Sequence, residues 1–180
     1  MPRGLDRERI LEAATQLLDE QGLAGFSMRR LGQLLDAVRD ELLASMPLPA
    51  PEGPWEAQVR EAALAFRELL REHPSSIPLF ASRAAVAPRS LQYYAACVAI
   101  LQRAGFSPVE SLYGFQTVFA VVIGHAQFHD TRLAEGEPED VAALYAPYPP
   151  LHGFAAYDRA AELTFALDAL LAGLRSRLPG

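Results

Sequence analysis

Apolar residues recur at spacings of three and four along almost the whole chain, from Ile10 to Leu174. This period indicates α-helices with one face turned to a core, because 3.6 residues complete one helical turn. No segment sustains the two-residue alternation of a half-buried strand. We therefore expect an all-α fold. With 180 residues, 51% of them hydrophobic, the chain can bury a substantial core.

Two helices are predicted near the N-terminus. The first spans about Arg7 to Gln21 and ends at Gly22, because glycine readily takes the left-handed conformation that closes a helix. Ser27 can cap a second helix that opens at Met28. The pair forms a compact N-terminal unit.

A proline-rich stretch divides the chain. Residues 47–54 read Pro-Leu-Pro-Ala-Pro-Glu-Gly-Pro and lack any helical period. Proline fixes its own backbone and removes a hydrogen-bond donor, so this stretch is a stiff joint. We place a domain boundary here and predict two domains, 1–46 and 47–180.

The second domain begins with three predicted helices, at about 55–71, 77–84 and 89–103. On the third helix, the spacing predicts that Leu91, Tyr94, Val98 and Leu101 form the buried side, and Gly105 is placed to end it.

The clearest helix start in the chain lies at Ser107-Pro108 with Glu110, a capping box with proline at the first helical position. The helix that follows, to about residue 129, is apolar nearly all round, unlike a surface helix of a monomer. Residues 130–151 are expected to be irregular, and a final leucine-rich helix spans about 156–177. We predict a homodimer that forms through the helices 108–129 and 156–177.

Composition narrows the functional classes. The formal net charge of −6 argues against a protein that coats nucleic acid nonspecifically, so any DNA contact must be local. No apolar run reaches the length of a membrane span, and the N-terminus lacks a signal-peptide core. We expect a cytoplasmic protein without membrane contact, in which the single cysteine, Cys97, is a buried core residue.

Several blocks of sequence resemble the tetracycline repressor (TetR) family. They are Arg-Ile-Leu-Glu-Ala-Ala at 9–14, the block 22–31, Gln-Arg-Ala-Gly-Phe-Ser at 102–107, Gly-His at 124–125 and the block 165–174. The resemblance implies an N-terminal helix-turn-helix domain that binds operator DNA. It also implies a C-terminal helical domain that binds a small-molecule effector and dimerises.

The chain departs from the family pattern between Leu35 and Asp36. Roughly eighteen residues that carry the recognition helix of the family are absent at this junction. Two explanations stay open: the natural protein has a segment that this sequence omits, or it has none. The apolar spacing also continues across the junction, so a single helix from Met28 to Met46 is the alternative to an incomplete helix-turn-helix unit.

Ser27, Met28, Arg29 and Arg30 are the candidate DNA-contacting residues. Free backbone N–H groups at a helix start, together with arginines, suit a phosphate, and the resemblance implies backbone contact in this region. The simpler interpretation is an ordinary capped helix with solvated arginines.

His125 and His129 lie at i and i+4, a spacing that can hold a metal ion. Two ligands do not make a site, so we expect pocket-lining or hydrogen-bonded histidines, with no metal and no cofactor. The tetracycline repressor binds a metal-chelated drug through a histidine that aligns with Leu79, which argues against a tetracycline–magnesium effector. No nucleophile–base pair and no glycine-rich phosphate loop occurs, so we predict no catalytic residue and no enzyme.

The second domain is rich in aromatic residues, which suit a cavity for a planar hydrophobic molecule. We select Phe66, Phe80, Phe115 and His125 as candidate effector-binding residues. Core and dimer packing is the alternative role for each.

Two functions follow. The first is a ligand-responsive transcription regulator, a repressor that a small hydrophobic or aromatic effector releases from its operator. The second is a dimeric protein of the same scaffold that binds a small molecule or a partner and does not read DNA.

Overall fold

The computed structural model describes residues 28–50, 52–82, 88–135 and 141–178. Every regular element in these ranges is a helix, which confirms the predicted fold class. The elements are α2 (Met28–Ser45), α3 (Trp55–Glu72), η1 (Pro74–Ser76), α4 (Ile77–Ser82), α5 (Pro88–Arg103), α6 (Pro108–Glu135), α7 (Val141–Tyr145), η2 (Pro149–Ala156) and α8 (Arg159–Arg175). The predicted helix 7–21 and Ser27, the predicted cap of the next helix, lie outside the described ranges.

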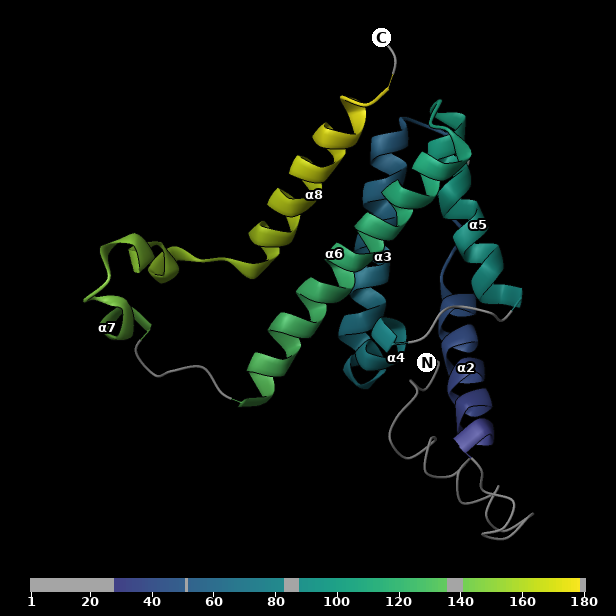
Figure 1. The fold of residues 1–180 in the computed structure, drawn as a ribbon. Coiled ribbons are helices and arrows are strands. Elements are labelled where there is room, and N and C mark those ends of the chain that lie inside the picture. The colour runs from purple at the N-terminus through teal and green to yellow at the C-terminus, as the bar shows by residue number, and fades with distance from the viewer. Residues whose placement is uncertain (1–27, 51, 83–87, 136–140, 179–180) are drawn as a thin grey trace, which may run out of the picture.

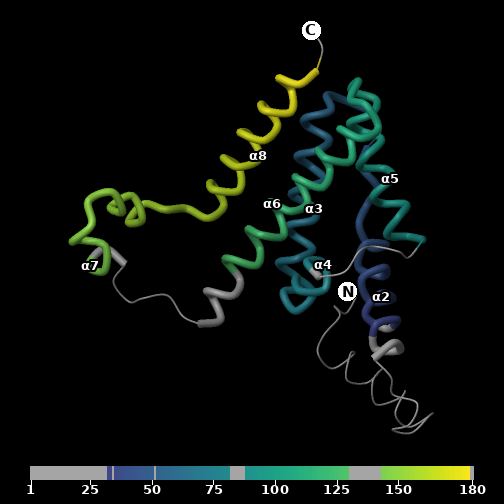
Figure 2. Tube along the Cα trace, in the orientation of Figure 1, coloured from purple at the N-terminus to yellow at the C-terminus, as the bar shows by residue number. Residues whose placement is uncertain are grey.

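The central element is α6, which packs against α3, α4, α5 and α8. Figure 1 shows α8 on one side of α6, with α5 and α2 on the other. The backbone trace in Figure 2 shows α7 and η2 as an arm that lies apart from the main helices. Among the described helices none is both long and apolar enough to cross a lipid bilayer.

One hydrophobic core runs through the described elements. Leu42 and Leu43 near the end of α2, and Met46 just after it, belong to the same buried cluster as the inner faces of α3, α5, α6 and α8. The core therefore continues past the proline-rich stretch at 47–54. The division into domains 1–46 and 47–180 stays a prediction.

A polar contact anchors α2 to α5. Oδ1 of Asp40 accepts hydrogen bonds from the backbone N–H of Ser90, at 2.7 Å, and from its hydroxyl, at 3.1 Å. Ser90 lies in the first turn of α5, where backbone N–H groups lack partners within the helix. The Asp40 carboxylate therefore serves as a cap for α5 that is supplied by another helix.

The predicted helix boundaries around residue 105 are confirmed. Gly105 has a φ of +104°, and the N–H of Phe106 donates to the carbonyl of Leu101, as in a glycine-ended helix. The capping box forms as expected: the N–H of Ser107 donates to Oε2 of Glu110 at 3.2 Å, and the N–H of Glu110 donates to Oγ of Ser107 at 3.3 Å.

The prediction of an irregular stretch at 130–151 was wrong in part. Helix α6 continues to Glu135, because Arg, Leu, Ala and Glu at 132–135 are good helix formers, and α7 and the start of η2 lie within the stretch. The final helix begins at Arg159 instead of about 156. Asp158 caps it, since its carboxylate accepts from the N–H groups of Ala160 and Ala161.

The predicted buried side of α5 was also wrong in part. Leu91 is exposed and Tyr94 and Val98 are only partly buried, whereas Tyr93, Cys97, Ile100 and Leu101 are buried. Apolar residues surround most of this helix, so their spacing alone could not fix which stripe faces the core.

Candidate ligand-binding cavity

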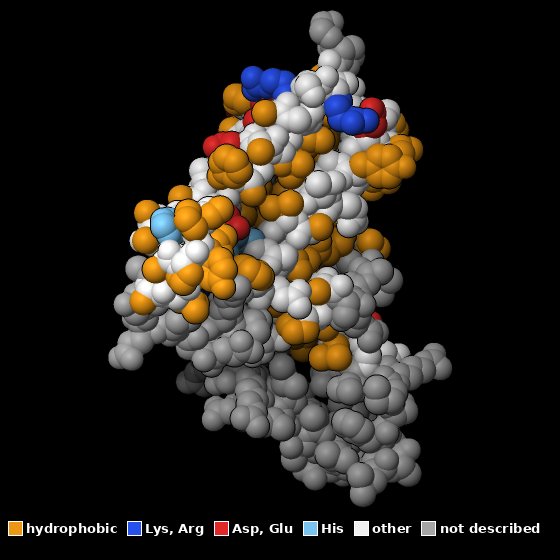
Figure 3. Space-filling view, turned by 60° about the vertical axis from the view of Figure 1, so that its left-hand side comes forward, with side chains coloured by type: hydrophobic (Ala, Val, Ile, Leu, Met, Phe, Trp, Pro, Cys, Tyr) orange, Lys and Arg blue, Asp and Glu red, His pale blue; other side chains and the backbone are white. Residues whose placement is uncertain are grey.

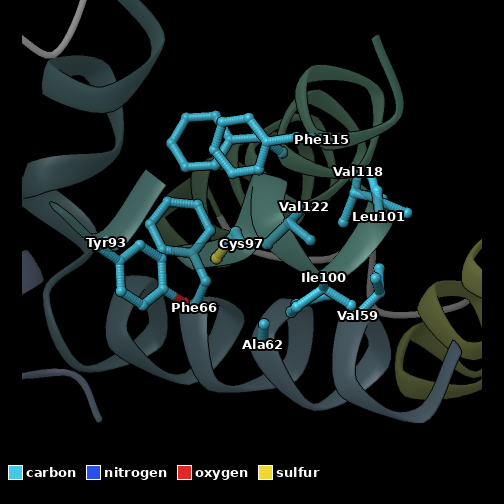
Figure 4. Close-up of a pocket in the computed structure, with 12 residues that line it drawn as sticks. Val59, Ala62, Phe66, Tyr93, Cys97, Ile100, Leu101, Phe115, Val118 and Val122 are labelled. Atoms are coloured by element: carbon cyan, nitrogen blue, oxygen red, sulfur yellow. The ribbon is translucent and has the colours of Figure 1, made fainter. Parts of the chain in front are cut away.

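A cavity of about 440 Å³, its open mouth included, lies among α3, α5 and α6. Each helix contributes one stripe of residues at spacings of one, three and four. The lining residues are Val59, Ala62, Ala63 and Phe66 from α3, Tyr93, Cys97, Ile100 and Leu101 from α5, and Phe115, Val118, Phe119 and Val122 from α6. In Figure 4, Phe66 and Tyr93 lie at one end of the cavity and Leu101 lies at the other.

Two of the four candidate effector-binding residues, Phe66 and Phe115, line this cavity. Both belong to an aromatic cluster with Phe119 at its centre. The Phe119 ring stacks on Phe66 with centroids 4.6 Å apart and lies 5.7 Å from the Phe115 ring. These rings form an aromatic part of the cavity wall.

The other two candidates lie elsewhere. Phe80 of α4 packs edge-on against Phe66, with the two ring centroids 5.2 Å apart, and is not one of the lining residues. His125 lies further along α6, where its Nε2 is 3.0 Å from the carbonyl oxygen of Arg159. A role in effector binding stays a prediction for all four residues.

The cavity wall offers two polar side-chain groups, the Tyr93 hydroxyl and the Cys97 thiol. Burial raises the pKa of Tyr93 above its ordinary value and raises the pKa of the Cys97 thiol to about 11. The two groups also hydrogen-bond to each other. At neutral pH both are uncharged, so the lining carries no formal charge.

Such a cavity can hold an uncharged, largely apolar molecule. Small-molecule sites are typically lined by such apolar and aromatic side chains with a few polar groups. A charged ligand would lose its hydration and find no opposite charge among the lining residues, which is costly.

Our selection of candidate residues missed most of the lining. Tyr93 lies outside the stripe of α5 that was predicted to be buried. Cys97 was correctly predicted to be buried, but only as a core residue. Phe119 was one of many aromatic residues with nothing to single it out. Each lining stripe keeps helical spacing, so the lining can be found once it is known which face each of the three helices turns toward the other two. The sequence of one helix taken alone does not give this orientation.

A second group of polar residues lies where α6 meets the start of α8. Nε2 of His129 is 2.6 Å from Oε2 of Glu162, and Nε2 of His125 is 3.6 Å from the same atom. Burial is the main cause that lowers the pKa of His125. A hydrogen bond from Tyr157 is the first cause that lowers the pKa of Glu162, and a hydrogen bond from His129 adds to it.

The candidate DNA-contacting residues lie at the start of α2 or before it. Ser27 is outside the described residues, and Met28, Arg29 and Arg30 form the first turn of α2. The helix then continues without a break through Leu35 and Asp36 to Ser45. Within the described residues, this junction therefore has the single-helix form and no turn to a separate recognition helix.

Helices α6 and α8 expose apolar surface that the chain itself does not cover. Leu163, Leu167 and Leu171 bury one stripe of α8, while Phe165 on the opposite face is 75% exposed. Tyr113 on α6 is 68% exposed. Figure 3 shows hydrophobic side chains gathered on the face that carries α8 and the arm.

The family described as Tetracyclin repressor-like, C-terminal domain matches residues 47–178, which is most of the chain. The all-helical fold and this match define the class of the protein as a helical transcription regulator. The chain belongs to the TetR family.

Two curated relatives are regulators. An HTH-type transcriptional regulator of Saccharopolyspora erythraea is 28% identical over 207 aligned residues, covering 94% of this chain and 87% of the relative. The HTH-type transcriptional repressor DrrR1 of Streptomyces coeruleorubidus is 26% identical over 143 residues, covering 68% of this chain and 53% of the relative. Because 207 aligned positions exceed the 180 residues of this chain, the first relative carries residues where this chain has none.

Among solved structures, ActR of Streptomyces coelicolor in complex with (S)-DNPA shares the fold. It is 23% identical, has a TM-score of 0.69, and the match covers 98% of this chain and 100% of ActR. ActR in complex with actinorhodin matches with a TM-score of 0.67 at 23% identity, over 97% of this chain and 98% of ActR.

Proposed function

We propose that this chain is a dimeric, ligand-responsive transcription repressor whose effector is an uncharged, largely apolar small molecule with a flat ring system. The observation that carries the proposal is the cavity among α3, α5 and α6, walled by the rings of Phe66, Phe115 and Phe119. Flat rings of a ligand can stack on these side chains in the offset or edge-on geometries that aromatic pairs prefer.

The similar proteins support both parts of this proposal, transcription regulation and small-molecule binding. The two curated relatives are named as a transcriptional regulator and a transcriptional repressor. ActR, which has this fold, was solved with the small molecules (S)-DNPA and actinorhodin. The fold therefore accommodates small organic ligands in another regulator.

A homodimer through α6 and α8 is part of the proposal. The exposed side of α6 carries Ala120 and Gly124, and that of α8 carries Phe165 and Ala169, all facing solvent in the single chain. Small residues allow two helices to approach closely, and a second copy would cover Phe165. The predicted helices 108–129 and 156–177 correspond to this surface.

Helix α5 supplies a route from the cavity to the N-terminal part of the chain. Its Tyr93 and Cys97 line the cavity, and one turn earlier Ser90 is bound by Asp40 of α2. An effector that displaces α5 would therefore move α2. Binding of effector and of operator DNA would then weaken each other by the same factor.

The uncharged dye Nile red tests the cavity, since its fluorescence rises in apolar surroundings. We expect one dye per chain and loss of binding in Ala62→Phe, because Ala62 lines the cavity and the larger ring fills it. Leu64→Phe is the matched control, since Leu64 is an exposed neighbour on the same helix.

The outcome is decisive once both variants are shown by circular dichroism to unfold at temperatures close to that of the parent protein. Equal dye binding by Ala62→Phe and the parent would refute the cavity as the site. Loss of binding in Leu64→Phe as well would point to a nonspecific surface effect.

A second candidate function is a dimeric ligand-binding protein that does not read DNA. The unbroken helix α2 favours it, because the described part of α2 lacks the turn before a recognition helix. The intact mass of the protein from its native host separates the two. A mass near 19.6 kDa supports the second candidate, and an excess of roughly eighteen residues supports the repressor.

A further inference from the structure

We propose that His125, His129 and Glu162 bind one divalent transition-metal ion, zinc in the first place, at the junction of α6 and α8. The two histidines lie one turn apart on α6, and Glu162 lies in the first turn of α8. One ligand atom from each residue can be chosen so that all three lie within 4.8 Å of one another. This site is separate from the cavity and does not depend on the proposed effector.

The donor set matches zinc chemistry. Two imidazoles and one carboxylate are a known zinc ligand set that leaves a fourth position open, and zinc accepts such donors in a tetrahedron. His129 is only 3% exposed, whereas Glu162 is partly exposed. The imidazole side of the site is therefore closed, and the carboxylate side is open enough for a water molecule as the fourth ligand.

The side-chain geometry places the ligand atoms close to the positions that a bound ion requires. Oε2 of Glu162 lies 2.6 Å from Nε2 of His129 and 3.6 Å from Nε2 of His125. Ligand atoms about 2.0–2.2 Å from a tetrahedral zinc ion lie roughly 3.3–3.6 Å from one another. Side-chain adjustments of about 1 Å would open the shorter distance, and the three ligand atoms, which lie within 4.8 Å of one another, would close around one ion.

The positions of the protons on the two imidazole rings also permit metal binding. Nε2 of His125 donates to the Arg159 carbonyl, and Nε2 of His129 donates to the Glu162 carboxylate. Each Nδ1 atom is buried and has no hydrogen-bond partner within the described residues. When the metal takes the Nε2 lone pair, the Nε2 proton can therefore move to Nδ1 without breaking a hydrogen bond at Nδ1. The hydrogen bonds from Nε2 to the Arg159 carbonyl and to the Glu162 carboxylate are then lost, and bonds from Nε2 and from the carboxylate to the metal replace them.

A bound ion would join two helices that are remote in sequence. It would fix the start of α8 against α6, next to the arm and to the surface proposed for the dimer. Metal occupancy would therefore stabilise the folded chain, since binding to the folded state alone shifts the unfolding equilibrium.

The test uses the full chain, freed of metal with a chelator and titrated with zinc against a chromogenic zinc chelator. We expect one zinc per chain and a higher melting temperature. Cobalt in place of zinc should give the strong visible absorption of a four-coordinate site. Glu162→Gln keeps the shape of the side chain and removes the charged ligand, and we expect it and His125→Ala to weaken zinc binding at least about 100-fold.

The control removes the two other histidines of the chain, His73 and His152, in a double alanine variant. It should bind zinc as tightly as the parent. The proposal is overturned if the parent binds zinc no more tightly than Glu162→Gln does, or if the control variant loses the binding. Because Glu162 is partly exposed, Glu162→Gln is expected to fold even if variants of the buried His129 do not.

Discussion

At the scale of single residues, Cys97 is the most informative reporter of the cavity. It is the only cysteine of the chain, so any thiol label reports on this position alone. Its side chain is buried in the cavity wall next to Tyr93. Burial raises its thiol pKa from 9.0 to about 11, which favours the unreactive protonated form.

We therefore predict slow alkylation of the folded protein by iodoacetamide at pH 8. The raised pKa lowers the thiolate fraction about 100-fold relative to the unfolded chain, and burial slows the reaction further. The protection should shrink as the pH approaches about 11, since the folded thiol then ionises. Mass spectrometry of the native and urea-unfolded protein measures both rates, and similar rates at pH 8 would contradict the buried position of Cys97.

At the scale of elements, the contact of Asp40 with the first turn of α5 predicts that Asp40 contributes to the stability of the fold. Asp40→Ala should lower the free energy of unfolding by about 1 kcal/mol, the usual cost of losing a helix cap. Glu41→Ala is the matched control, because Glu41 is the exposed neighbour. Urea unfolding of both variants measures the difference, and equal stabilities would show that Asp40 does not hold α5.

Local signals in the sequence predicted most of the helices. The boundaries at Gly105 and Ser107 could be placed because a positive φ and a capping box each depend on neighbouring residues only. The end of α6 could not, because whether a helix passes through Asp130 and Thr131 depends on packing and on the residues beyond.

The candidate site was predicted less completely than the fold. Phe66 and Phe115 were selected for their size and aromatic character, and both line the cavity. Tyr93 was not, because the orientation of α5 is set by contacts with α2, α3 and α6 together. Glu162 was not linked to His125 and His129, because 33 residues separate it from His129 in the chain. Contacts between residues so far apart in the sequence are set by the fold and not by local sequence.

At the scale of the whole molecule, the exposed apolar faces of α6 and α8 predict a dimer in solution. Phe165→Glu should convert the dimer to a monomer, or weaken it at least about tenfold, because a charge would be buried at the interface without a partner. Leu64→Glu replaces an exposed leucine of α3 and should leave the dimer intact. Sedimentation equilibrium of the three proteins decides between these outcomes, and a monomeric parent protein would rule out the proposed interface.

The proposed regulator also needs a link between the cavity and DNA, which runs from the cavity wall through α5 and the Asp40–Ser90 contact to α2. Because the formal net charge is −6, binding to DNA must come from a local basic surface and must fall steeply with salt.

The most direct test of this account is a gel-shift experiment with the full-length protein and the promoter region of its own gene, at low salt and with unrelated DNA as competitor. We predict a specific shift that unrelated DNA does not abolish and that a ligand of the cavity weakens. The absence of any specific shift at low salt would contradict the proposed repressor and leave the ligand-binding dimer as the function of this scaffold.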